Sequence, residues 1–414
     1  MAKHRNRRDF LKTAAALSLV ALLPQACAIA PTPEFRPIRL SGWKGPSGAT
    51  PGRTVIFVEM FGGNDGLNTV IPYQDPKYRA LRPTIAMAAH DVIRTSDTLG
   101  YHPALESAMA LWERGEMAAV LGVGYDAPNR SHFRSQEIWE TASNSSEVLI
   151  EGWLARATAE HPRLRQRRGD AEAIALCGGS LGALLGRGAR VVTMNDPRQY
   201  VRDARRLGEV PPVTTSAAVT HLVETQADTL ATAIALRTKI ESRQRFEGKL
   251  PGHGLGRNLA NAVALLDAGV DVPIIKVTHS GFDTHANQLA RHETLLRQLA
   301  ESMTGLRDAL RQIGRWDDTL VFAYSEFDRR AAENNSRGTD HGTAGVVFFF
   351  GGQIAGGTFG RQPSLDDLVD GDLRFNVEYR QLYASLLANW WGQPDNFLAA
   401  KGHRPLPLFR AATA

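Results

Sequence analysis

The chain has 414 residues, with 48 lysines and arginines, 43 aspartates and glutamates and a formal net charge of +5. Its first 30 residues contribute +4 of that charge, so the remainder has a net charge of about +1. This balance does not support a nucleic-acid partner, and the length suffices for one large α/β domain or for two smaller domains.

The N-terminus has the pattern of an export signal. Arg7 and Arg8 are followed by Phe-Leu-Lys, by a mildly apolar run over 13–23 and by an Ala-x-Ala-like end at residue 28 or 30. This predicts a twin-arginine signal over residues 1–30, which the twin-arginine export machinery would carry, and a periplasmic or extracellular protein. The run is shorter than the ~20 residues that cross a bilayer, so we expect no membrane span after cleavage.

The two cysteines allow one alternative for the N-terminus. Cys27 fits a lipoprotein anchor, but Pro24-Gln-Ala before it fits that pattern poorly. Only Cys177 remains after cleavage, so the mature chain forms no internal disulfide. Residues 31–52, rich in proline, glycine and serine, predict a linker that leads into a single domain over 53–414.

An apolar run over 53–60 predicts the first buried strand, and a glycine-rich turn with Asp65 follows it. The turn lacks the lysine and the spacing of a phosphate-binding loop. Asp65 is therefore either a ligand at a strand end or a simple turn aspartate.

The next segment predicts a helix over 103–114, a strand over 117–123 and a helix over 133–141. Ser131 lies at the expected N-terminus of the last helix, after a strand. A serine in this position is either a helix cap or a nucleophile, because unpaired backbone amides and the helix dipole face it.

Residues 171–176 predict another strand, and the segment after it offers a second candidate nucleophile. Gly178-x-Ser180-x-Gly182 matches the nucleophile elbow of α/β hydrolases, and Ser180, Asp283 and His341 follow that fold's chain order. The glycines that follow Ser180 argue against the long helix that the elbow requires, so we rank this hypothesis lower.

Residues 196–255 are polar and helix-prone and predict an inserted helical cap. A strand over 272–277 then ends in a loop that carries Asp283 and His285. A long amphipathic helix is expected over 288–313, with His292 on it as a surface or packing residue.

The last two predicted strands, 319–323 and 346–350, enclose a loop rich in candidate ligands. Ligands of open α/β sheets gather at the carboxyl ends of strands, so these side chains should meet at one edge. Carboxylates and imidazoles together suit a divalent cation, either one ion or a pair about 4 Å apart, of zinc, manganese or calcium. The candidate ligands are Asp65, Asp283, His285, Glu326, Asp340 and His341.

Five motifs in this order resemble a large exported bacterial family, domain of unknown function fifteen-oh-one. They are Gly62-Gly-Asn-Asp-Gly-Leu-Asn68 with Pro72-Tyr73, Asn129-Arg-Ser-His-Phe133, Gly281-Phe-Asp-Thr-His285 with Gln288, Ser325-Glu-Phe327 and Gly338-Thr-Asp-His-Gly342. That family looks like a branch of the alkaline phosphatase and sulfatase superfamily, in which a central sheet flanked by helices carries two metal ions and a nucleophile.

The resemblance implies a role for each matching residue. Ser131 would be the nucleophile, Asp65 and Glu326 would hold one ion, and Asp283, His285 and His341 would hold the other. It also implies an exported hydrolase of small anionic phosphate or sulfate esters. The alternatives are a non-catalytic binding or assembly protein on the same fold, and a serine esterase that uses Ser180.

Three departures from the pattern bear on the site. The middle pair is Asp283-Thr-His285, where the superfamily has Asp-x-x-x-His, and Phe327 follows Glu326, where the superfamily has a histidine. The family has Gly-Arg-Thr after Ser-Glu-Phe, whereas this chain has Asp328-Arg-Arg330. Its two arginines are expected to be a solvated pair, with binding of a substrate anion as the alternative.

Overall fold

The computed structural model describes residues 52–160, 170–176, 178, 180–186, 190–204, 217–242 and 250–410, without the side chains of 217–229. The predicted signal, Cys27, Cys177 and all but the last residue of the predicted linker lie outside this part. Within it, no helix is both long enough and apolar enough to cross a bilayer.

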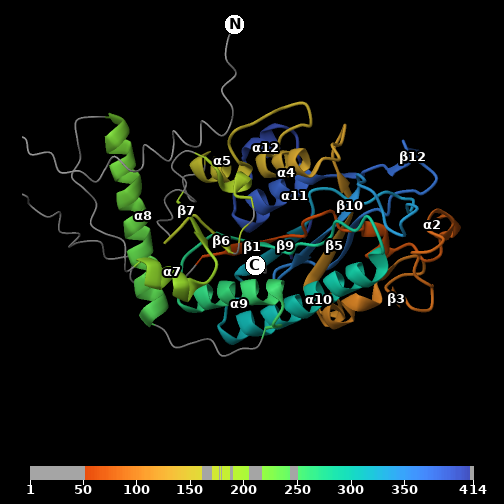
Figure 1. Cartoon of the computed structure of the whole chain (residues 1–414), viewed down its shortest axis with the longest axis horizontal. Coiled ribbons are helices and arrows are strands. Elements are labelled where there is room, and N and C mark those ends of the chain that lie inside the picture. Colours follow the sequence, from red (N-terminus) through yellow and green to blue (C-terminus); the bar gives the residue numbers. More distant parts are fainter. Residues whose placement is uncertain are drawn as a thin grey trace, which may run out of the picture. The chain divides into compact units, whose positions relative to one another are not determined.

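A nine-stranded sheet forms the centre of the domain (Figure 1). In spatial order its strands are β11 (Gly357–Gly360), β5 (Met117–Gly124), β10 (Gly345–Phe350), β9 (Thr319–Tyr324), β1 (Thr54–Glu59), β8 (Ile274–Thr278), β6 (Ala173–Leu176) and β7 (Val191–Met194), with β14 (Val377–Glu378) beside β5. Every neighbouring pair is parallel except the two that involve β10. The strands predicted from apolar runs correspond to β1, β5, β6, β8, β9 and β10.

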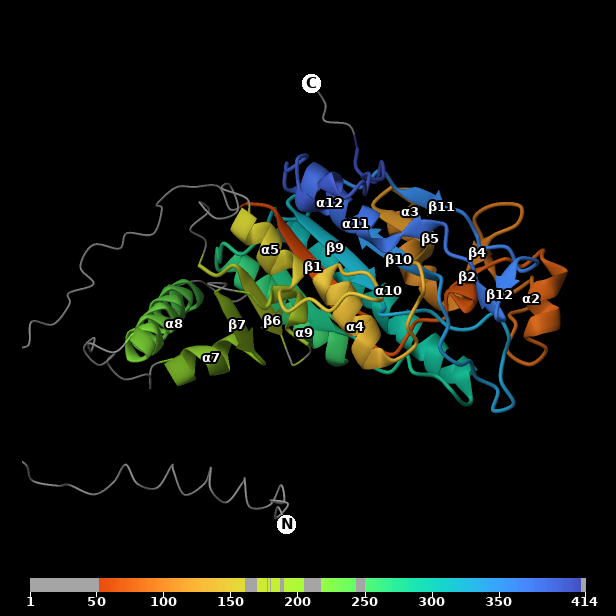
Figure 2. The same ribbon diagram turned by 90° about the horizontal axis from the view of Figure 1, so that it is seen from above.

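Helices cover both faces of this sheet (Figures 1 and 2). One face carries α4 (His132–Thr141), α5 (Trp153–Glu160), α11 (Tyr379–Ser385) and α12 (Phe397–Ala400), and the other carries α3 (Met109–Glu113), α9 (Gly254–Asp267), α10 (Gln288–Gln312) and the 3-10 helix η3 (Pro103–Ala108). The predicted α/β class, a mostly parallel sheet sandwiched by helices, is confirmed.

Alternation along β1 explains the two layers. Ile56 and Val58 pack into the core formed with α9 and α10, whereas Val55 and Phe57 pack into the core formed with α4, α5 and α11. Successive side chains of a strand point to opposite faces, so a strand that is apolar throughout has both faces buried.

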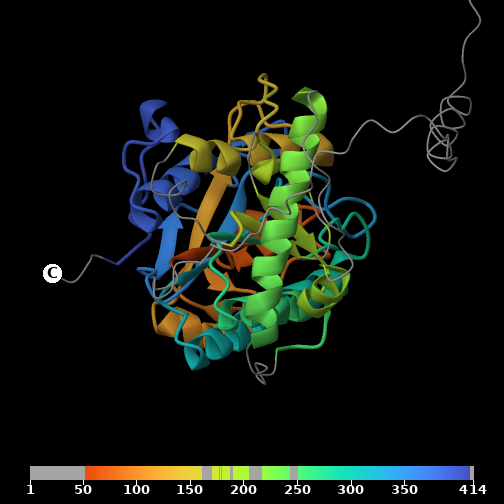
Figure 3. The ribbon, with the colours of Figure 1, turned by 90° about the vertical axis from the view of Figure 1, so that its left-hand side faces the viewer.

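The remaining elements lie at the ends of the sheet. Of the predicted helical cap, the structure describes α7 (Pro197–Ala204) and α8 (Ala217–Ser242), which pack together beside β7 (Figure 3). Residues 205–216 and 243–249 of that cap lie outside the described part. The opposite end holds α2 (Pro76–Leu81), β2 (Val70–Ile71), β3 (Ile93–Arg94), β4 (Gly100–Tyr101), β12 (Leu368–Val369) and β13 (Asp372–Leu373).

The antiparallel strand β10 determines where the last candidate loop lies. β9 runs parallel to β1 and ends at the common carboxyl edge, and the antiparallel β10 begins at that same edge. Residues 325–344 connect these two ends, so the connection stays at the edge where the loops after β1 and β8 also lie. The topology therefore brings the predicted site residues into one region.

Candidate metal centre

The loops after β1, β8 and β9 are held together by backbone contacts. Met60 N donates to Tyr324 O at 2.7 Å, and Phe282 N donates to Phe61 O at 3.1 Å. Gly62 has φ +116°, and a Cβ on it would lie 2.2 Å from the backbone nitrogen of Asp283. Only glycine permits both this conformation and this close approach, which places Asp283 directly beside the first loop.

Asp283 is the centre of a cluster of three histidines. Its Oδ1 lies 3.1 Å from His285 Nε2 and 3.2 Å from His341 Nε2, and its Oδ2 lies 3.5 Å from His132 Nε2. Burial opposes ionisation of Asp283, but the hydrogen bond from Arg329 and the contact with His341 overcome that effect and lower its pKa to about 2. The cluster thus holds a carboxylate at neutral pH.

Each histidine uses its other ring nitrogen for a hydrogen bond that orients the ring. His341 Nδ1 lies 2.7 Å from the backbone oxygen of Arg130. His285 Nδ1 lies 3.1 Å from Asp340 Oδ1, and His132 Nδ1 lies 2.8 Å from Glu326 Oε1. This is how metal-ligating histidines are commonly held, because an oxygen acceptor at one nitrogen fixes the tautomer and leaves the other nitrogen free.

Two of the imidazoles face each other through nitrogens that lack protons when neutral. A carbonyl oxygen only accepts, so His341 Nδ1 carries the proton. Asp340 is a carboxylate, because hydrogen bonds from Asn334 and His285 lower its pKa, so His285 Nδ1 carries the proton as well. The two Nε2 atoms lie 2.9 Å apart, so the lone pairs of two neutral rings in these tautomers repel each other, and a metal ion or a proton between them relieves that repulsion.

These residues therefore fit a metal ion. His132, Asp283 and His341 each place one ligand atom within 4.8 Å of the others. His285 Nε2 adds a fourth donor beside two of these atoms. Three imidazole nitrogens and one carboxylate suit zinc and other transition metals.

Two of the predicted ligands lie behind the cluster. Glu326 is buried beneath His132, where its oxygens also accept from Gly62 N at 2.9 and 3.2 Å, and burial raises its pKa. Asp340 is exposed and contacts Nδ1 of His285, the ring nitrogen that does not face Asp283 and His341. Each of these two carboxylates therefore orients one histidine ring of the cluster.

Asp65 lies apart from the imidazoles, in a fully buried ion pair with Arg82. Arg82 Nη1 is 2.9 and 2.7 Å from its two oxygens, and Gln288 and the Asn68 backbone also donate to it. Burial opposes ionisation, but the charge of Arg82 overcomes it and lowers the pKa of Asp65. The glycine-rich turn is thus fastened to the core by this pair.

Ser131 is exposed at the N-terminus of α4, next to His132. Its side chain makes no capping hydrogen bond, and its backbone nitrogen instead donates to Asn129 Oδ1 at 2.9 Å. Ser131 thus occupies the N-cap position of α4 without the side-chain hydrogen bond of a capping serine. His132 contacts Asp283, and the carbonyl oxygen of Arg130 contacts His341. Ser131 lies between these two residues in the chain and is therefore next to the cluster.

Two residues of the cluster were not expected there from the sequence. His132 lies in a motif quoted above, in which Ser131 and not His132 was the candidate site residue. Arg329 is not solvated as expected, since its side chain is fully buried and donates to Gly63 O and Thr339 O at 2.9 Å and to Asp283 Oδ1 at 2.6 Å. A single buried arginine thus links the loops after β1, β8 and β9.

The alternative triad built on Ser180 is not assembled. Ser180 Oγ donates to Glu140 Oε2 at 2.9 Å, whereas His341 contacts Asp283, His285 and the Arg130 carbonyl. The segment after Ser180 forms only the short 3-10 helix η4 (Gly182–Leu184), so the long helix of a nucleophile elbow is absent from this part of the described chain.

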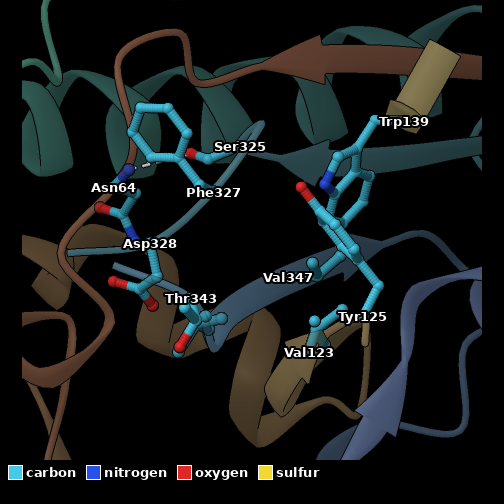
Figure 4. Close-up of a pocket in the computed structure, with 12 residues that line it drawn as sticks. Asn64, Val123, Tyr125, Trp139, Ser325, Phe327, Asp328, Thr343 and Val347 are labelled. Carbon is cyan, nitrogen blue, oxygen red and sulfur yellow. Dashed lines mark hydrogen bonds between the residues drawn. The ribbon is translucent and has the colours of Figure 1, made fainter. Parts of the chain in front are cut away.

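A small cavity lies beside the centre, under Phe327 (Figure 4). Its volume is about 10 Å³, which matches one water molecule. Asn64 and Asp328 face it from one side and Trp139 from the other. Asn64 Nδ2, Asp328 Oδ2 and Trp139 Nε1 are buried without a hydrogen-bond partner among the described residues. Burial and the charge of Asp65 raise the pKa of Asp328 well above its usual value.

This raised pKa predicts that Asp328→Asn stabilises the protein increasingly as pH rises. A carboxyl group whose pKa is higher in the folded state than in the unfolded state stabilises the folded protein at a pH below the unfolded-state pKa of about 3.9. This stabilisation is lost as the pH rises toward the folded-state pKa. The variant's advantage in unfolding free energy should grow by about 1.4 kcal/mol per pH unit from about pH 4.5 until the folded-state pKa is reached. Urea denaturation at several pH values measures it, with the exposed Asp367→Asn as control. A pH-independent difference would contradict the assignment.

The comparisons with known proteins identify the family. The model of the family "Protein of unknown function (DUF1501)" matches residues 52–412. The chain belongs to this family. No curated protein matches it in sequence.

Solved structures similar to this DUF1501 protein include members of the superfamily that its motifs resemble. One is a protein in the alkaline phosphatase superfamily from Vibrio parahaemolyticus, with 9% identity, 83% of this chain and 70% of that chain covered and a TM-score of 0.34. Another is a phosphonate monoester hydrolase of Agrobacterium radiobacter, with 11% identity, 84% and 75% coverage and a TM-score of 0.36. A third is the C-terminal periplasmic domain of EcEptC from Escherichia coli in complex with zinc, with 8% identity, 73% coverage of each chain and a TM-score of 0.36. No activity follows from likeness at this level.

Proposed function

We propose that this DUF1501 protein is an exported, metal-dependent hydrolase of phosphate or sulfate esters. The observation that carries the proposal is the convergence of three histidine Nε2 atoms on the carboxylate of Asp283. Among the described residues, His132, Asp283 and His341 form the one group whose ligand atoms lie close enough together to share an ion, so the proposal is for a single ion. The twin-arginine pattern of the first 30 residues supports export.

The donor set favours zinc or manganese over calcium. Calcium takes six to eight oxygen ligands, whereas three of the four donors here are imidazole nitrogens. A bound divalent ion would supply Lewis-acid stabilisation of the negative charge that develops on a phosphoryl or sulfuryl oxygen. Asp283 and His285 are the exposed members of the set, each with 44% of the side chain exposed, so a substrate would approach from their side.

The chain's own residues would orient the metal ligands and attack the ester. Glu326, Asp340 and the Arg130 carbonyl fix the three rings, and Arg329 fixes Asp283. Ser131 is proposed as the nucleophile, because its hydroxyl makes no capping bond and it precedes His132 directly. Unpaired amides in the first turn of α4 would favour an anionic group beside it.

The experiment is a comparison of ester hydrolysis with and without a chelator. Purified protein supplied with zinc or manganese is expected to hydrolyse 4-nitrophenyl phosphate, bis(4-nitrophenyl) phosphate or 4-nitrophenyl sulfate. We expect His341→Ala to lower kcat by at least about 100-fold, because losing the ion removes several kcal/mol of charge stabilisation. A matched control is His90→Ala, which removes a histidine with 84% of its side chain exposed.

Folding of the variant must be intact, which far-UV circular dichroism and a thermal unfolding curve check. Equal activity of His341→Ala and the wild type would contradict the proposal. A folded, metal-loaded wild type that hydrolyses none of these esters would instead favour a non-catalytic binding protein.

A further inference from the structure

Helix α4 turns one polar face toward the sheet. His132, Gln136 and Glu140 follow one another at intervals of four residues, so they lie on the same face of the helix. His132 Nδ1 lies 2.8 Å from Oε1 of Glu326, in the loop after β9. Gln136 Nε2 donates to Oε1 of Glu59, the last residue of β1, at 2.9 Å. This face of α4 is therefore tied to two neighbouring strands at the edge that carries the metal centre.

The third residue of this face, Glu140, contacts a buried lysine on β8. Lys276 Nζ lies 3.1 Å from Glu140 Oε1 and 3.3 Å from Glu59 Oε2. It also donates to the backbone oxygen of Ser180 at 2.6 Å, and Ser180 Oγ donates to Glu140 Oε2 at 2.9 Å. No more than 8% of any of the three charged side chains is exposed. We call the following residues the α4 anchor: Glu59, Gln136, Glu140 and Lys276.

Apolar packing alone would attach α4 to the sheet. Ile138 and Trp139 are buried in the core, and the Trp139 ring stacks on that of Tyr324 with the centroids 5.4 Å apart. Removing an ammonium group and two carboxylates from water is unfavourable, and apolar residues of similar size often stabilise a protein as well as a buried ion pair does. The α4 anchor instead restricts the helix, because the hydrogen bonds of Gln136 and Glu140 form at only one position of α4 along the sheet.

His132 is the metal ligand whose position depends on α4. It is the first residue of that helix, whereas the other three proposed ligands lie in loops. Its Nε2 is also the farthest of the three histidine nitrogens from the Asp283 carboxylate, at 3.5 Å against 3.1 and 3.2 Å. A small shift of α4 therefore moves this ligand away from the other three.

We infer that the α4 anchor positions His132 for metal binding, with Lys276 as its central residue. Lys276 acts through the helix and not as a ligand, because its amino group contacts two carboxylates and a backbone oxygen. This rests on the proposed function, and it extends the metal centre to residues of the sheet beneath α4.

Lys276→Met is expected to weaken zinc binding at least about tenfold and to leave two imidazole ligands on the ion in place of three. Tenfold is the lower end of the loss caused by removing a group that orients a metal ligand. Competition with a chromophoric chelator measures the dissociation constant of the full chain, and X-ray absorption counts the imidazoles. Ile138 and Trp139 still attach α4 in this variant, so it should fold with reduced stability.

Arg307→Met is the matched control, because it also removes a cation from a mostly buried pair. The side chains of Arg307 and Glu116 are 15% and 10% exposed, and their closest atoms lie 2.5 Å apart. Neither residue belongs to α4. Arg307→Met should therefore lower stability without changing the zinc affinity or the number of imidazole ligands.

Gln136→Met is a second test, and it leaves Lys276 with both of its carboxylates. It should also weaken zinc binding and lower the number of imidazole ligands. Glu137→Gln, at a side chain of the same helix that is 37% exposed, should change neither.

Zinc binding by three imidazoles at wild-type affinity, in whichever of the Lys276 and Gln136 variants folds, would overturn this inference alone. An equal loss in Arg307→Met would also overturn it, because the effect would then follow stability. A folded wild type that binds no zinc would overturn the proposed metal centre together with the inference.

Discussion

Replacing Asp283 with alanine is expected to weaken binding of zinc or manganese by at least about 100-fold. In the part of the chain that the structure describes, the carboxylate of Asp283 is the one group that contacts all three histidine Nε2 atoms. Loss of a residue that merely orients a ligand costs 10–100-fold in metal affinity, so loss of the shared ligand itself should cost more. Competition with a chromophoric chelator measures the dissociation constant.

The substitution leaves the buried Arg329 without its carboxylate partner and should lower stability, but the variant should still fold, because Arg329 keeps its hydrogen bonds to the carbonyl oxygens of Gly63 and Thr339. Asp367→Ala is the matched control, since Asp367 is an exposed aspartate paired with the exposed Arg374. An unchanged metal affinity in a folded Asp283→Ala variant would show that the ion is held elsewhere or is not bound at all.

Replacing Arg82 with methionine is expected to lower the unfolding free energy by about 3–5 kcal/mol, because it leaves Asp65 buried without its counter-ion. Both side chains of this pair are fully buried, and their closest atoms lie 2.7 Å apart. Urea denaturation measures the loss. The turn that carries Asp65 also positions Gly62 against Asp283, so the centre should loosen together with the fold.

Two further variants distinguish the contribution of the ion pair to stability from that of side-chain volume. Arg374→Met removes an exposed pair of similar length, which should cost no more than about 1 kcal/mol. The double variant Asp65→Asn/Arg82→Met removes both charges and should recover part of the loss. A loss below about 1 kcal/mol for Arg82→Met would contradict the assignment of Asp65 to this pair.

The sheet and the proximity of Asp283, His285 and His341 could both be predicted from the sequence, and for the same physical reason. Apolar runs mark strands that are buried on both faces, and parallel strands end at a common edge, so the loops after β1, β8 and β9 had to lie together. The long helix α10 was predicted to within one residue, because its apolar positions recur at helical spacing.

The roles of individual charged residues could not be predicted in this way. An aspartate that binds an ion and one that pairs with a buried arginine look alike in sequence, and Arg82, the partner of Asp65, lies 17 residues away. In the sequence Arg329 looks like a surface arginine, because the oxygen atoms that accept its hydrogen bonds come from three separate loops. His132 was missed because a histidine in the first turn of a helix gives no signal unless Glu326 is known to lie beneath it.

The most direct test is the metal content of the purified full chain, by mass spectrometry after supply of zinc or manganese, with X-ray absorption to identify the ligands. We expect one ion per chain, bound by three imidazole nitrogens and a carboxylate oxygen. A folded chain that takes up neither metal, or an ion without imidazole ligands, would contradict it.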